Sequence, residues 1–86
     1  MENLTQVDGL EINQVEDGFI IYHAVRDRVH FLNHTAVFVL ELCNGRHEPK
    51  EIIEIVRASY SLTEPPEEEV WEVLEKLAGE GLIRSR

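Results

Sequence analysis

The sequence has one cysteine in 86 residues, and no apolar run approaches the length of a membrane span. A single cysteine, Cys43, rules out an internal disulfide and is typical of a reducing compartment. A membrane-spanning helix needs about 20 predominantly apolar residues, and residues 1–3 do not open a signal peptide. We therefore expect a cytoplasmic protein that does not enter the membrane, with a small core that depends on packing alone.

Positive charge is scarce. Eight lysines and arginines stand against 17 aspartates and glutamates, so the formal net charge is −9. The carboxylates are densest between residues 64 and 80, where Lys76 is the one cation. Such a surface repels phosphate backbones and attracts basic partners, so we expect no nucleic-acid binding. Most of these carboxylates are expected to form a solvated helix face.

Signatures of catalysis and metal binding are missing as well. The histidines and Cys43 show no CxxC, HxxxH or HExxH spacing, and there is no glycine-rich phosphate loop. If residues 26 and 27 formed a two-residue turn, His23 and His30 would face each other across a hairpin, but two ligands make a weak site. Cys43 lies among apolar residues, where a thiol loses reactivity. We expect no metal, no cofactor and no enzymatic activity.

The first 32 residues favour strands. Apolar runs rich in β-branched and aromatic residues are separated by turn signals. Asp17-Gly18 marks the first turn, because glycine can take a positive φ without steric cost, and the charged residues 26–28 mark the second. The strands are expected at residues 10–15, 19–25 and 29–32. Together they predict a three-stranded antiparallel meander.

After residue 32 the apolar spacing becomes that of helices. Asn33 is a suitable N-cap, since its side-chain oxygen can accept from an N–H of the first turn, and Thr35 could serve if the helix starts later. The next residues are apolar on nearly every side, which is typical of a buried helix, and Gly45 can end it. Two more helices are expected at residues 49–60 and 66–78.

These elements predict an α+β fold in which a three-stranded antiparallel meander is followed by three helices (βββααα). Residues 1–9 are polar and expected to form a flexible lead-in, and residues 10–86 a single domain. If strand order follows the sequence, residues 29–32 form an edge strand. An open edge beside an acidic helix is suited to accept an extended peptide as a fourth strand.

Trp71 has two possible roles. It lies about 100° around the expected third helix from Val70, at the edge of the buried stripe. It can be a residue at the margin of the core, or it can line a groove beside the helix, since tryptophan is enriched at binding hot spots.

Several blocks of the sequence resemble the PqqD-like family. They cover residues 10–84 in the order and spacing typical of that family. The blocks are Asp17-Gly18 with the apolar strand after it, Leu32-Asn33-His34-Thr35-Ala36, Leu40-Glu41-Leu42-Cys43-Asn44-Gly45, Pro49 with Glu51-Ile52, and Leu77-Ala78-Gly79-Glu80-Gly81-Leu82-Ile83.

The resemblance implies a winged-helix-like fold, also called the RiPP recognition element. Such a domain binds the leader of a ribosomally made precursor peptide and presents it to a modifying enzyme, often a radical SAM maturase. In the family the leader adds as a strand beside the third strand and packs against the third helix. The matching positions are Val29, His30, Phe31 and Leu32 on the strand and Val70, Trp71, Leu74, Lys76 and Leu77 on the helix. The rival interpretation is a winged-helix DNA-binding regulator, whose third helix would then bring carboxylates against phosphates.

Overall fold

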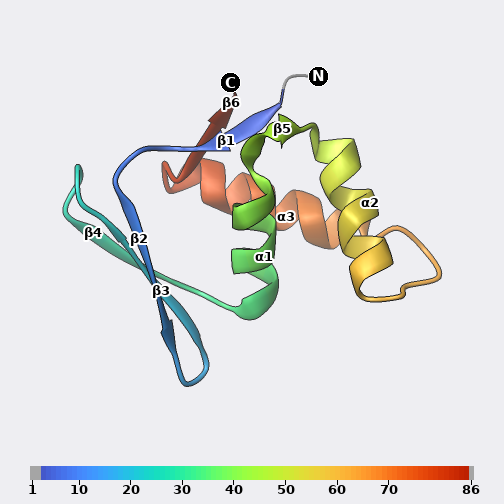
Figure 1. The fold of residues 1–86 in the computed structure, drawn as a ribbon, viewed down its shortest axis with the longest axis horizontal. Helices are drawn as coiled ribbons and strands as arrows, with labels where there is room; N and C mark the ends of the chain where they lie inside the picture. Colours follow the sequence, from blue (N-terminus) through green and yellow to red (C-terminus); the bar gives the residue numbers. More distant parts are fainter. Residues whose placement is uncertain (1–2, 86) are drawn as a thin grey trace.

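The computed structural model describes residues 3–85 and contains two small sheets and three helices (Figure 1). The strands are β1 (Leu4–Gln6), β2 (Leu10–Val15), β3 (Gly18–His23), β4 (Arg28–Leu32), β5 (Asn44–His47) and β6 (Ile83–Ser85). The helices are α1 (His34–Leu42), α2 (Pro49–Ser59) and α3 (Glu67–Gly79). Strands β2, β3 and β4 form the expected antiparallel meander, and the three expected helices follow it, so the α+β class is confirmed.

The second sheet was not expected from the sequence. Its strand order is β5-β1-β6, and β1 is antiparallel to both neighbours. Strand β1 lies within the segment expected to be a flexible lead-in, and it joins the start of the described chain to its end by pairing with β6. Met1 and Glu2 of that lead-in, and Arg86 of the expected domain, lie outside the described residues. The domain boundary at residue 10 stays a prediction.

The turn between β3 and β4 is longer than expected. His23 pairs with Arg28, and Ile21 pairs with His30, so four residues close the hairpin. Asp27 adopts a positive φ of 52°, its N–H donates to the Ala24 carbonyl at 3.3 Å, and its carboxylate accepts from the Tyr22 hydroxyl at 2.8 Å. Aspartate tolerates this left-handed conformation. The two-residue turn that would place His23 opposite His30 is therefore wrong.

Gly18 lies just after the turn between β2 and β3, and glycine is needed there for lack of space and not for a positive φ. The turn is formed by residues 16 and 17, and Gly18 pairs with Val15 without adopting a positive φ. A Cβ atom on Gly18 would lie 2.6 Å from the carbonyl oxygen of Leu32 and 2.8 Å from the ring of Phe31. Glycine is required here because β4 approaches the start of β3 too closely for a side chain.

Helix α1 is the centre of the core. Asn33 is its N-cap, as expected, and its Oδ1 accepts from the Ala36 N–H at 2.8 Å. The helix contacts both other helices and strands of both sheets, and in Figure 1 it lies between the β2–β4 sheet and α2. Fully buried side chains from different elements meet around it, including Ile21, Leu40, Ile52 and Leu77. No helix within residues 3–85 is long and apolar enough to cross a membrane.

Substitution of Asn33 tests the cap. In Asn33→Ala the Ala36 N–H loses its acceptor, and we expect the free energy of unfolding to fall by about 1 kcal/mol. Asn33→Asp keeps an acceptor oxygen and should stay close to wild type. Urea unfolding followed by far-ultraviolet circular dichroism measures both variants. An equal loss in the two variants would contradict the capping role.

Two glycines form a matched pair for testing the packing of β4. Gly18→Ala is expected to lower the free energy of unfolding by about 1–3 kcal/mol, because the Leu32 main chain cannot move aside. A Cβ on Gly79, at the end of α3, would meet nothing within 4 Å. Gly79→Ala should therefore leave the stability unchanged or raise it by up to about 1 kcal/mol. Thermal unfolding of the two variants separates the local clash from a general effect of removing glycine.

Candidate functional site

Strand β4 has a free edge. In the described part of the chain, β3 is its one neighbour in the sheet. The Ala24 N–H donates to the carbonyl of the residue before β2 at 3.0 Å, so the main chain of Ala24 faces the β2 side. Main-chain groups of successive strand residues point to opposite sides, so Ile21 faces β4, where it pairs with His30. The N–H and C=O groups of Val29 and Phe31 therefore point away from β3.

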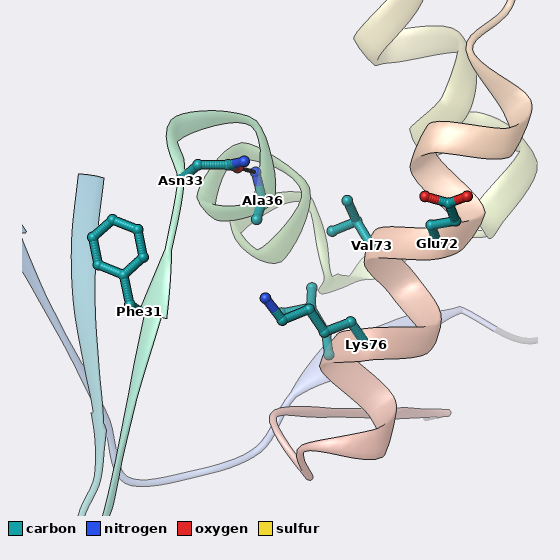
Figure 2. A pocket seen from close by; sticks show the side chains of 7 residues that line it. Phe31, Asn33, Ala36, Glu72, Val73 and Lys76 are labelled. Atoms are coloured by element: carbon teal, nitrogen blue, oxygen red, sulfur yellow. Dashed lines mark hydrogen bonds between the residues drawn. The ribbon is translucent and has the colours of Figure 1, made fainter. Parts of the chain in front are cut away.

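A groove of about 440 Å³ separates this free edge from helix α3 (Figure 2). We call it the β4–α3 groove, and it is lined by Phe31, Asn33, Ala36, Glu72, Val73, Lys76 and Leu77. Figure 2 shows Val73 and Lys76 pointing from α3 toward β4, whereas the Phe31 ring points away from the helix. The groove thus joins a strand edge whose outer main-chain groups have no strand partner within residues 3–85 to a helix wall that is partly apolar and carries one cation, Lys76, and one carboxylate, Glu72.

One polar contact joins the two walls. His30 Nδ1 of β4 lies 3.4 Å from Glu80 Oε2, just beyond the C-terminal end of α3. The His30 side chain is only 9% exposed. Its Nε2 atom and Glu80 Oε1 are buried without a hydrogen-bond partner among the described residues. This contact links β4 to the C-terminal end of α3.

The four strand residues expected at the site have different environments. Val29 and Phe31 are 63% and 51% exposed, and their side chains lie on the face of the sheet away from the core. His30 reaches across to α3. Leu32 is buried in the core, where it anchors the end of β4.

The five helix residues expected at the site do not share one face. Lys76 and Leu77 line the β4–α3 groove. Val70, Leu74 and Leu77 are all buried in the core, so Leu77 lies at the floor of the groove without being exposed in it. Trp71 lines hollows on the other flank of α3 and does not line the groove.

The structure adds residues that the sequence did not single out for the site. Ala36 and Asn33 come from the start of α1, and Glu72 and Val73 from α3. Val73 lies three residues before Lys76, a spacing that places two side chains on one side of a helix. This spacing was available from the sequence, but Val73 also fits the apolar stripe of the core, so it was not distinguished.

Other kinds of chemistry find little support in the described residues. Residues 3–85 contain no group of three or more histidine, cysteine, aspartate or glutamate side chains arranged to hold a metal ion. Cys43 is fully buried, and its burial raises the pKa of the thiol to about 12. The thiol is therefore protonated at neutral pH and is not an activated nucleophile.

Known proteins share this fold. The family model for "Coenzyme PQQ synthesis protein D (PqqD)" matches residues 18–83. The solved structure "TbiB1 in Complex with the TbiA(beta) Leader Peptide" is similar at 20% identity and a TM-score of 0.75, covering 95% of this chain and 96% of that one. "Lasso peptide synthetase B1 complexed with the leader peptide" is similar at 15% identity and a TM-score of 0.73, covering 95% and 98%. No curated protein matches the sequence.

The reactivity of Cys43 can be measured directly. At pH 8 the folded protein should react with a thiol reagent such as DTNB far more slowly than the unfolded protein, because the buried thiol stays protonated and shielded. The reaction followed at 412 nm, with and without denaturant, gives the ratio of rates. A fast reaction of the folded protein would contradict the buried environment of Cys43.

Proposed function

The chain belongs to the PqqD family, and on this premise we propose that it is a RiPP recognition element, a non-catalytic protein that binds the leader of a ribosomally made precursor peptide. The leader would add to the sheet as a strand beside β4. The observation that carries this proposal is the free main-chain edge at Val29 and Phe31, which faces α3 across the β4–α3 groove. Both structural relatives are complexes with leader peptides, which supports the same kind of ligand here.

Strand addition fits the chemistry of the groove. Main-chain hydrogen bonds to β4 would supply affinity, and pockets for alternate side chains would supply specificity. Every second side chain of the peptide would point toward Val73, and the others would lie beside Val29 and Phe31 on the outer face. The apolar residues favour apolar leader side chains on both faces. Lys76 favours a leader carboxylate beside it, whereas Glu72, which also lines the groove, disfavours one near its own end of the wall.

Delivery to a modifying enzyme is the second part of the proposal. The partner enzyme would act on the core of the precursor while this chain holds the leader, and a radical SAM maturase is the enzyme class that the family resemblance implies. Cys43 is fully buried and its raised pKa keeps the thiol protonated, so this side chain is not a candidate for that chemistry.

Titration of the ¹⁵N-labelled protein with the precursor peptide encoded beside it tests the proposal. We expect the largest amide shifts at residues 28–33 and 72–77, which form the two walls of the groove. N-methylation of single peptide residues should weaken binding at every second position, because only alternate N–H groups face β4. Shifts confined to other surfaces, or no shifts at high peptide excess, would overturn strand addition at β4.

A pair of valine variants tests the helix wall of the groove. Val73→Asp places a charge toward β4 and is expected to weaken leader binding by about tenfold or more. Val25→Asp makes the same chemical change at the hairpin tip, where the side chain is 78% exposed, and should bind as wild type. Isothermal titration calorimetry measures both affinities. Circular dichroism shows whether each variant is folded, and equal affinities in folded variants would count against the groove.

A further inference from the structure

Helix α3 has a second exposed flank, where Trp71 lies. At roughly 100° per residue, Trp71 is about 160° around the helix from Val73, which points into the β4–α3 groove. The Trp71 side chain is 38% exposed although it is large and mostly apolar. A peptide bound at β4 would leave this flank uncovered. Neither the core nor the groove therefore accounts for the position of Trp71.

Trp71 forms a wall between two hollows. One has a volume of about 410 Å³ and lies between the start of α2 and the start of α3, with Ile53 at its apolar side. The other has a volume of about 230 Å³ and is lined mainly by apolar side chains of β1, α2, α3 and β6, including Leu4, Pro49 and Ala78. A partner side chain could enter either hollow and pack against the indole, which is the arrangement typical of a binding hot spot.

The charge around Trp71 limits the choice of partner. The two hollows are lined by Glu48, Glu67 and Glu75 against a single cation, Lys50. The chain also carries a formal net charge of −9. A second copy of this acidic chain would bring like charges together, which disfavours self-association through this face. A protein with basic residues around a protruding apolar side chain is complementary to it.

We propose that Trp71 and its two flanking hollows, together called the Trp71 surface, form a docking site for a second protein with such a basic, apolar-centred patch. The inference rests on the proposed function in one respect, because it takes this second protein to be the enzyme that modifies the bound precursor. The leader and the enzyme then occupy opposite flanks of α3 at the same time. Indole packing supplies most of the affinity, and the carboxylates steer the basic partner.

The composition of the chain supplies a reporter for this site. Trp71 is the only tryptophan, so labelling with 5-fluorotryptophan gives a single ¹⁹F resonance that reports on the Trp71 surface alone. Adding the precursor leader should leave this resonance in place while the amides of β4 shift. Adding the modifying enzyme encoded beside the chain should shift or broaden it. A leader that moves the resonance as much as the enzyme does would assign this surface to the peptide and overturn the inference.

Substitutions then measure the contribution of each group. Trp71→Ala is expected to weaken enzyme binding by about tenfold or more, measured by biolayer interferometry, with leader affinity unchanged. Glu67→Gln with Glu75→Gln should slow association at low salt. The matched control is Glu11→Gln with Glu16→Gln, which removes the same charge from exposed positions on and beside β2 and should have a smaller effect.

The outcomes separate this inference from the proposed function. In one outcome the leader does not bind, but Trp71→Ala still weakens enzyme binding. This result would overturn peptide binding at the β4–α3 groove and leave the Trp71 surface supported. In another outcome the leader binds, but Trp71→Ala binds the enzyme as tightly as wild type does. This result would overturn only the docking role of the Trp71 surface. An enzyme that does not bind the wild-type chain, or self-association that Trp71→Ala abolishes, would also overturn it.

Discussion

The hydrogen bond from the Ala36 N–H to the Asn33 side chain is the contact on which the arrangement of the site depends. It allows β4 to end at Leu32 and α1 to begin at His34, with one residue between them. Because Leu32 is buried against the core and α1 is the central helix, this end of β4 has little freedom to move. Farther along the strand, His30 contacts Glu80 beyond the end of α3. The main chain of Val29 and Phe31 is therefore held in place, and its outer side has no strand partner among residues 3–85.

A rigid, unpaired strand edge is normally a liability, because it offers a template for pairing with another copy of the same chain. Two features of this protein counter that risk. The net charge of −9 opposes the approach of a second copy, and the edge faces α3 across a groove, so the helix limits access to it (Figure 2). An extended single peptide can enter such a groove more easily than the edge of a folded sheet can. The same features that limit self-association thus favour a flexible peptide ligand.

The order of the main elements could be predicted from the sequence because their signals are local. The cap at Asn33, the proline at the start of α2 and the periodic apolar stripe of α3 act over one or two helical turns. The second sheet could not be predicted in this way. Strands β1 and β6 have three residues each, too few for a periodic pattern, and they pair across almost the whole length of the chain.

From the sequence, the candidate site could be predicted only as far as the two elements that form the walls of the β4–α3 groove, and its role stays a prediction. The sequence and the family resemblance indicated residues 29–32 and the third helix. The apolar stripe of that helix has two edges, however, and the sequence does not say which edge faces β4 and which faces solvent. Val73 and Leu74 are both apolar neighbours on α3, yet Val73 borders the groove and Leu74 the core. Their difference comes from how α3 is rotated against α1, which depends on side chains distant in the sequence.

That rotation has a consequence for function. Val70, Leu74 and Leu77 are buried on one side of α3 and fix how the helix is turned about its axis. With this side fixed, Val73 and Lys76 must face β4, and Trp71 must face the opposite flank. The width of the β4–α3 groove and the orientation of the indole therefore depend on the same three buried residues. A peptide bound at β4 and a second protein bound at Trp71 would therefore be oriented relative to each other by the same helix, α3.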